Sequence, residues 1–174
     1  MPSNQHIVER ALERIDAGYV FPEKTAAVEA AMWCGYFFRD DQVHLKDIYD
    51  RRTDTTRQFW TAGHLPAPRY ADRPVYVLTS GTTFSASEGI AYTLQAHGRA
   101  VVVGETTRGG AHPTERHAIT EHILVTVPTA RTVNPLTGAN WEGVGVVPDV
   151  PVPAERALAE AIGAAARRVE MPPR

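Results

Sequence analysis

The sequence predicts a mixed α/β fold built around a mainly parallel sheet. A β-branched run at 74–79, a helical pattern at 82–98 and a second apolar run at 99–104 follow one another directly. Strand, helix and strand in this order form a βαβ unit, whose two strands are parallel neighbours. A second observation is the alanine-rich amphipathic pattern at 154–165, which predicts another helix.

The first 32 residues have a different pattern, which predicts a small helical hairpin. Apolar side chains recur at three- and four-residue spacings over 4–17, and Gly18 ends that helix. Pro22 stands at a favourable first-turn position for a second helix. We therefore divide the chain into an N-terminal helical segment, 1–32, and an α/β domain, 33–174.

Residues 33–73 are expected to be mostly irregular, because aromatic and charged residues are mixed there and Pro66 and Pro68 interrupt any long element. One short strand is expected around Val43–Tyr49. Cys34 is the only cysteine and lies in an aromatic run, so we interpret it as a buried structural thiol rather than a nucleophile.

Inside the βαβ unit, Ala86, Ile90 and Leu94 recur every four residues, and Gly98 is placed to close the helix in a left-handed cap. A glycine-rich turn follows the second strand. Beyond that turn we expect a β-hairpin near the sheet. Its parts are a strand at 119–128, a turn at 134–138 and an apolar run at 143–148.

Composition and charge exclude several classes of function. Eighteen Lys and Arg against 20 Asp and Glu give a net charge of -2, so no excess of positive charge is present to hold a nucleic acid. The apolar runs are far shorter than the roughly 20 residues that span a bilayer. The N-terminus lacks the basic and apolar regions of a secretory signal. We expect no nucleic-acid or membrane partner and, for the chain as written, a cytoplasmic location, while export of a longer form stays open.

The tetrapeptide Ser85-Ala-Ser-Glu88 directly follows the first strand of the βαβ unit and opens its helix. A serine at a helix N-terminus meets exposed backbone N–H groups and the positive end of the helix dipole, which favour an alkoxide or a neighbouring oxyanion. The same residues also fit a capping box, in which the serine hydroxyl and the Glu88 carboxylate satisfy backbone donors. The tetrapeptide alone leaves a nucleophile and a helix cap as alternatives.

Six motifs occur in order along the rest of the chain. They are Pro74-Val-Tyr-Val-Leu, Thr83-Phe-Ser-Ala-Ser-Glu88, Gly98-Arg-Ala-Val-Val-Val-Gly-Glu-Thr-Thr107, Gly109-Gly-Ala-His-Pro113, Asn134-Pro-Leu-Thr-Gly-Ala-Asn-Trp-Glu-Gly143 and Gly145-Val-Val-Pro-Asp149. With these motifs the sequence resembles the C-terminal processing (tail-specific) protease family of serine peptidases, in its interphotoreceptor retinoid-binding protein-like branch. The resemblance covers residues 33–165, and residues 5–32 resemble the helical N-terminal domain of that branch. It implies a ClpP/crotonase-like ββα superhelix, shortened in this chain, and hydrolysis of peptide or protein substrates.

By this resemblance Ser85 is the nucleophile, Glu88 the acidic residue that supports it, and the backbone N–H of Ala86 an oxyanion donor. The lysine that family members place about 25 residues after the serine corresponds to Gly110 here. The general base must then come from elsewhere. His112, two residues further on, is the nearest candidate, and His44 and His64 come after it.

A second departure concerns a strand upstream of the serine. Family members carry there an Asp-Leu-Arg-x-Asn-x-Gly-Gly motif whose glycine amides help to form the oxyanion hole, and no such motif occurs in this sequence. Loss of one oxyanion donor lowers the rate by about 100- to 1,000-fold. The alternative function is therefore a catalytically incomplete homologue that binds a peptide or an apolar ligand. The missing strand should also leave an open sheet edge, which predicts that the chain forms a homodimer or aggregates.

No cofactor and no metal are predicted. Gly104–Ala111 has the spacing of a phosphate-binding loop, but Gly110 and Ala111 stand where such a loop has Lys and Ser or Thr. His112, His117 and His122 recur every five residues. On a strand this odd spacing puts successive side chains on opposite faces, which does not make a common metal centre.

Overall fold

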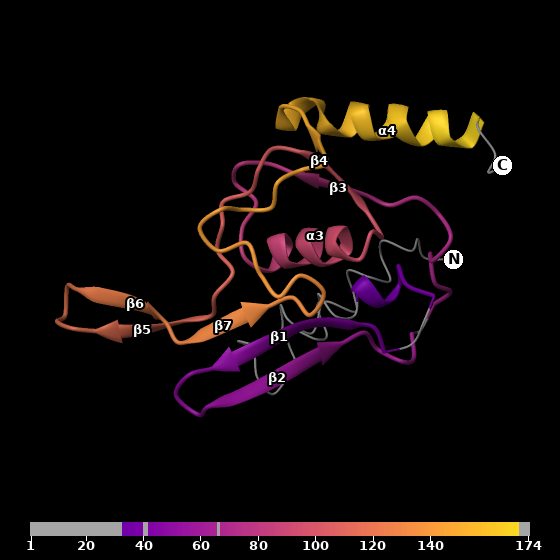
Figure 1. Ribbon diagram of the computed structural model, residues 1–174. Helices are drawn as coiled ribbons and strands as arrows, with labels where there is room; N and C mark the ends of the chain where they lie inside the picture. Colours follow the sequence, from indigo (N-terminus) through magenta and orange to yellow (C-terminus); the bar gives the residue numbers. More distant parts are fainter. Residues whose placement is uncertain (1–32, 40–41, 66, 171–174) are drawn as a thin grey trace.

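The computed structural model describes residues 33–39, 42–65 and 67–170, and Figure 1 shows their arrangement. In chain order the elements are β1 (His44–Asp50), β2 (Thr55–Trp60), β3 (Tyr76–Thr79), α3 (Ala86–Ala96), β4 (Val101–Gly104), β5 (Thr114–Ala118), β6 (Leu124–Pro128), β7 (Ala130–Val133), β8 (Val150–Pro151) and α4 (Ala154–Glu170). The helical hairpin predicted for 1–32 lies outside the described residues. Within those ranges no helix combines the length and the apolar character needed to cross a membrane.

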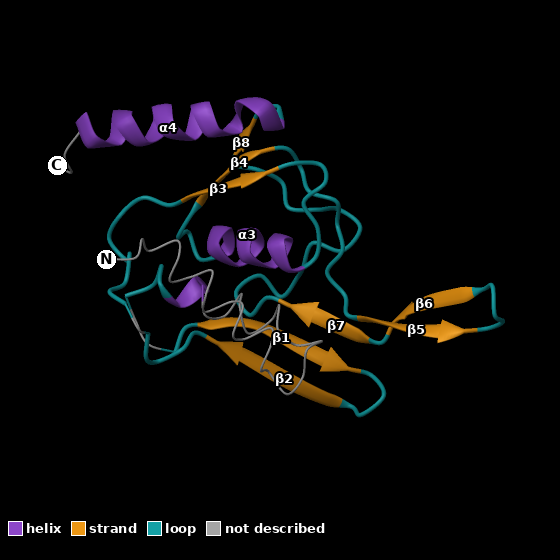
Figure 2. Ribbon diagram, turned by 180° about the vertical axis from the view of Figure 1, so that it is seen from behind, coloured by secondary structure: helices purple, strands orange, loops and turns teal. Residues whose placement is uncertain are grey.

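The predicted βαβ unit is confirmed. β3 and β4 pair in parallel, with Tyr76 opposite Val101 and Thr79 opposite Gly104, and β8 adds in parallel to the other side of β4. α3 connects the two strands on one face of this sheet, and α4 covers the opposite face (Figures 1 and 2). The parallel sheet is therefore covered by a helix on each face, as parallel sheets generally are.

α3 lies between the parallel sheet and a second, antiparallel sheet of order β2-β1-β7 (Figure 2). Two clusters of buried side chains surround the helix, and they consist of Ala91, Val102, Ala111, Trp141 and Val146, and of Cys34, Leu45, Leu94 and Ala100. Because Leu45 belongs to β1, the second cluster ties the antiparallel sheet to the helix. The helix ends as predicted, with Gly98 in the left-handed region at φ 62°.

The antiparallel sheet corrects one expectation. The short strand predicted at 43–49 is confirmed as β1, but β2 lies inside the stretch predicted to be irregular, so that prediction is wrong there. Nearly every side chain of β2 is exposed, so the strand carries no alternation of apolar residues. Its pairing with β1, which cannot be seen in a local pattern, makes it a strand.

The predicted hairpin is placed differently in the structure. β5 pairs with β6 in a two-stranded hairpin that projects away from the helices, as both ribbon views show. The strand predicted at 119–128 is therefore only 124–128, and 143–148 is not a strand. Gly143 and Gly145 have φ values of 72° and 75°, which a strand does not allow. The predicted turn at 134–138 is confirmed, because the Asn134 side-chain oxygen accepts two backbone N–H bonds there.

Candidate active site

Ser85 lies where the chain turns from β3 into α3. The turn is closed by two hydrogen bonds: the Thr83 N–H donates to the Ser80 carbonyl at 3.0 Å, and the Ser80 N–H donates to Thr83 Oγ1 at 3.0 Å. Ser85 is then the N-cap residue of α3, exposed, with φ 57° and ψ -120°. A non-glycine residue in such a conformation costs about 1–3 kcal/mol. Sharp strand-to-helix turns of this kind present nucleophilic serines in other folds.

The first N–H groups of α3 lie next to Ser85. The Gly89 N–H donates to the Ser85 carbonyl at 3.0 Å and so begins the helical hydrogen bonds. The N–H groups of Ala86 and Ser87 precede that bond and have no acceptor within the helix. Together with the helix dipole they make this end of the helix electropositive. The Ala86 N–H, the oxyanion donor that the family resemblance implies, lies at this point.

Glu88 is fully buried, at 0% exposure, and its carboxylate joins Ser85 to the turn at 107–110. Oε2 accepts the backbone N–H groups of Ser85 at 2.7 Å and Gly110 at 2.9 Å. Oε1 accepts the Gly109 N–H and the Thr107 hydroxyl, each at 2.6 Å. Burial by itself raises the pKa of Glu88, but the four hydrogen bonds outweigh it and the pKa is lowered. The carboxylate is thus ionised, and it holds the backbone on both sides of the site.

Thr107 takes part in the site although its sequence position did not predict this. Its hydroxyl donates to Glu88 and accepts the Val146 N–H at 2.7 Å, and the Thr107 N–H donates to the Val146 carbonyl at 3.2 Å. The glycine-rich turn is therefore held both by the Glu88 carboxylate and by the backbone of Val146. Residues 39 positions apart make this contact. No local pattern in the sequence could have marked Thr107 for that role.

The Phe84 ring lies over Gly110. A Cβ added to Gly110 would come within 2.2 Å of the ring. The guanidinium carbon of Arg108 is 5.3 Å from the centre of the same ring, and Phe84 is 48% exposed. The space in which a side chain at position 110 would begin is thus occupied by an aromatic ring from the residue preceding Ser85.

His112 is held away from Ser85 by other partners. Its ring Nδ1 accepts the Thr132 N–H at 3.4 Å, and its backbone N–H donates to the Glu142 carboxylate at 3.1 Å. In the described part of the chain, no histidine or lysine side chain is hydrogen-bonded to the Ser85 hydroxyl. The structure therefore brings Ser85, Ala86 and Glu88 together but does not join His112 to them.

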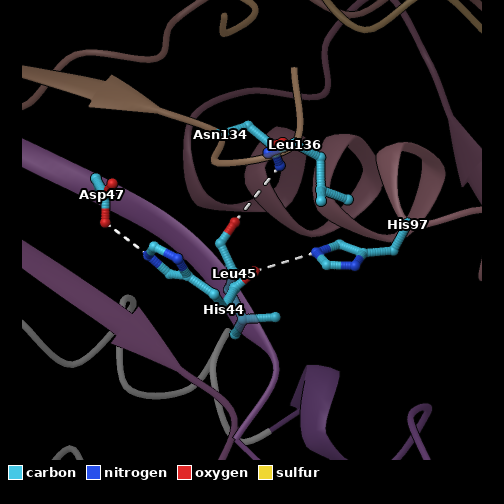
Figure 3. Close-up of polar contacts among 6 residues, drawn as sticks. All are labelled: His44, Leu45, Asp47, His97, Asn134 and Leu136. Carbon is cyan, nitrogen blue, oxygen red and sulfur yellow. Dashed lines mark hydrogen bonds and ion pairs between the residues drawn. The ribbon is translucent and has the colours of Figure 1, made fainter. Parts of the chain in front are cut away.

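His44 lies at the other end of α3 (Figure 3). Its Nε2 is 2.6 Å from Asp47 Oδ1, and its carbonyl oxygen is 3.2 Å from Nε2 of His97. His97 caps the C-terminal end of α3, so at 1.5 Å per residue it is roughly 18 Å along the helix from Ser85. His44 is thus not placed to take a proton from Ser85.

One histidine candidate, His64, and the two lysines of the sequence remain. His64 is exposed on a loop. Lys46 lies over the Phe59 ring, 5.3 Å from its centre, and burial lowers the pKa of this lysine. Lys24 lies outside the described residues. Across the described ranges, no group of three or more His, Cys, Asp or Glu side chains is arranged to hold a metal ion.

A groove of about 590 Å³ begins next to the serine. β3 contributes residues 77–79 to its lining, the turn contributes residues 82–84, and α3 contributes Ser87 and Ile90. None of these side chains is charged. β3, which lines the groove, is an end strand of its sheet in the described part of the chain.

The fold is shared with solved structures of proteases. The photosystem II D1 C-terminal processing protease superposes with a TM-score of 0.54 at 27% identity, covering 75% of this chain and 31% of that one. A candidate peptidase from Parabacteroides merdae superposes with a TM-score of 0.65 at 17% identity, covering 81% of this chain and 48% of the other. The second likeness shows the fold alone.

Sequence comparison leads to the same group of enzymes. A carboxy-terminal-processing protease from Bartonella bacilliformis is 32% identical over 81 residues, which are 47% of this chain and 18% of that protein. These similarities place the chain among the serine-type peptidases. Residues 24–152 match the family model for Peptidase family S41, and the chain belongs to this family. It spans less than a fifth of its Bartonella relative and less than a third of the D1 processing protease.

Proposed function

We propose that this chain hydrolyses peptide bonds in peptide or protein substrates, with Ser85 as the nucleophile. The observation that carries the proposal is the backbone of Ser85, held at φ 57° and ψ -120° at the start of α3 with its side chain exposed. A strained backbone that the surrounding hydrogen bonds maintain is a feature of functional sites. Membership of a peptidase family supports the class of substrate.

In the proposed reaction the Ser85 Oγ attacks the carbonyl carbon of the scissile bond, and a general base takes the hydroxyl proton. The Ala86 N–H stabilises the oxyanion of the tetrahedral intermediate. Glu88 positions this donor by holding the Ser85 N–H. Collapse of the intermediate releases the amine, which takes up the proton, and water then hydrolyses the acyl-enzyme by the same steps.

We propose His112 as the base, because it follows the glycines that Glu88 binds and has an acceptor nitrogen in its ring. To act as the general base, the His112 ring must break its bond with the Thr132 N–H and form one with the Ser85 hydroxyl instead. Apo sites commonly form such catalytic hydrogen bonds only when substrate is bound. The six sequence motifs support two finer assignments within this proposal: the shortened ClpP/crotonase-like superhelix and the interphotoreceptor retinoid-binding protein-like branch.

A second candidate function is a binding module without turnover. It is favoured by one observation: in the described residues no basic side chain is bonded to the Ser85 hydroxyl, while an uncharged groove lies open next to it. Such a module would hold a peptide or an apolar ligand in this groove.

Labelling with a fluorophosphonate probe tests the proposed reaction. We expect covalent labelling of the wild type, none of Ser85→Ala, and undiminished labelling of Leu158→Ala, a control at an exposed leucine on α4. His112→Gln should label more slowly than the wild type. Failure of the freshly folded wild type to label, together with heat of peptide binding in calorimetry, would favour the binding module instead.

A further inference from the structure

The β5–β6 hairpin lies apart from the helices and has an apolar surface. It projects outward in both ribbon views and, within the described residues, forms a sheet of two strands by itself. Such a hairpin is only marginally stable in water unless a further strand or a helix supports it. Its large apolar side chains are 40% to 65% exposed, and they are Ile119, Ile123, Leu124, Val125 and Val127. An exposed apolar surface of this kind indicates an interaction site.

Most of these apolar residues share one face of the hairpin. Residues directly opposite each other in an antiparallel pair point to the same face. Val125 is opposite His117, and Val127 lies two positions further along the same strand. The Ile119 N–H donates to the Ile123 carbonyl at 2.9 Å, so the ladder continues to these two residues. The face is therefore apolar along β6 and at the tip of the hairpin.

The hydrogen-bond pattern leaves backbone groups unpaired along the outer edge of β6. Ile123 and Thr129 both bond to the β5 side, through the Ile123 carbonyl and the Thr129 N–H. Alternate residues of a strand point to opposite edges. Pro128 points outward and offers only a carbonyl. Leu124 and Thr126 each present an N–H and a carbonyl at this edge, where no described strand pairs.

The two edges of the hairpin differ in charge. β5 has the sequence Thr-Glu-Arg-His-Ala, and charged side chains on an edge strand oppose pairing. β6 has the sequence Leu-Val-Thr-Val-Pro, without a charge, and its register with β5 has no shift. Its proline is the last residue of the strand. An additional strand would therefore pair with β6.

The edge of β6 is complementary to itself. When two copies lie antiparallel with Leu124 opposite Thr126 of the partner subunit, these two residues exchange both backbone hydrogen bonds, and the N–H that proline lacks is not needed. The same register places Val125 opposite Val125 of the partner subunit, and Ile123 opposite Val127 of the partner subunit. Such β-branched pairs across strands are favourable. One two-fold axis through Val125 generates all of these contacts, as in most homodimers.

We propose that two copies of the chain associate through β6, so that their hairpins join in one antiparallel sheet. The centre of this sheet is apolar and its outer strands are polar, which is the usual arrangement of a protein interface. The contact is on the hairpin, whereas Ser85 lies at the start of α3, so the dimer does not depend on the proposed reaction. A different protein with an uncharged strand is the competing occupant.

Sedimentation of two matched proline variants tests the proposal. Thr126→Pro removes an N–H from the outer edge of β6, and Arg116→Pro removes one from the outer edge of β5 at the position directly opposite. Neither N–H bonds within the hairpin. We expect a concentration-dependent dimer of the wild type, a dissociation constant raised about tenfold or more in Thr126→Pro, and an unchanged one in Arg116→Pro. A wild type that is monomeric at millimolar concentration, or a dimer that Thr126→Pro leaves intact, would overturn the proposal.

Disulfide formation tests the register separately. The Cα atoms of Val125 and its partner copy would lie about 4.5 Å apart, which a disulfide can bridge. His117→Cys is the control, because it lies on the same face but on the outer strands, about 14 Å from its partner copy. Cys34 is buried and takes no part. Under mild oxidation Val125→Cys should become a covalent dimer on a non-reducing gel, and His117→Cys should stay a monomer. Equal cross-linking of both variants, or none of Val125→Cys, would contradict the model.

Discussion

The Phe84 ring lies so close to Gly110 that a Cβ at position 110 would come within 2.2 Å of it. Gly110 has no positive φ, so its backbone would accept a side chain, and the ring alone is the obstacle. Gly110→Lys should therefore destabilise the chain by about 1–3 kcal/mol, through displacement of the ring into solvent. The same substitution in a Phe84→Ala background should cost less.

Urea denaturation of the wild type, both single variants and the double variant measures this coupling. An interaction free energy of about 1 kcal/mol between positions 84 and 110 is expected. Strict additivity would show that the ring does not resist a side chain at 110. The double variant should also label faster with a fluorophosphonate than Phe84→Ala does, because it places an amine on the residue whose N–H shares Glu88 Oε2 with the Ser85 N–H.

The Glu88 carboxylate accepts four hydrogen bonds, and no neutral side chain replaces it. In Glu88→Gln the amide NH₂ would face two of the four donors, which lose their acceptor in a buried site. We expect a loss of about 3 kcal/mol in unfolding free energy and no Ser85 labelling. Glu142→Gln is the matched control, since that carboxylate also accepts two N–H groups of the same turn but is exposed. A loss there as large as that of Glu88→Gln would mean that burial is not the cause.

The lowered pKa of Glu88 makes stability depend on pH in a defined direction. The unfolded chain takes up the proton near the ordinary value of 4.5, and the folded chain only at lower pH. The contribution of Glu88 is therefore fully present above about pH 4.5 and is lost as the pH falls through the lowered pKa. The unfolding free energy of the wild type should decline more steeply below pH 4.5 than that of Glu88→Gln. Parallel curves would contradict this.

Because Ser85 has a positive φ, glycine should be more stabilising than alanine at this position, which is the opposite of the usual order in a helix. Glycine adopts φ 57° without steric cost and alanine does not, so Ser85→Gly should be more stable than Ser85→Ala by about 1–2 kcal/mol. At Ser87, inside the helix, the order should be the usual one, with alanine better than glycine by about 0.5–1 kcal/mol. Thermal denaturation measures the stabilities of the four variants. If alanine were more stable than glycine at both positions, strain at Ser85 would be refuted.

Cys34 is 2% exposed, and burial raises the pKa of its thiol to about 12, with Lys46 acting in the opposite direction. At pH 8 the folded chain should hold almost no thiolate. We expect iodoacetamide to label Cys34 only after urea unfolds the chain, at the same midpoint as the loss of secondary structure. Rapid labelling without urea would place Cys34 outside the core.

The βαβ unit, the closing helix and the buried thiol were predictable because each depends on a local pattern. Ala86, Ile90 and Leu94 recur every four residues and are followed by Gly98. β2 and the β5–β6 hairpin were not predictable in the same way. Their side chains are mostly exposed, so pairing with a neighbouring strand, and not an apolar pattern, decides their structure.

The sequence by itself determined the family, the strand–turn–helix that carries Ser85, and the absence of a lysine at position 110. Only the tertiary structure decided what surrounds the serine. It joins Glu88 to Thr107 and Gly109, sets the Phe84 ring over Gly110, and leaves His112 bonded to Thr132. These contacts join residues about 20 or more positions apart. Tertiary packing brings such residues together, and no periodic pattern in the sequence reveals these contacts.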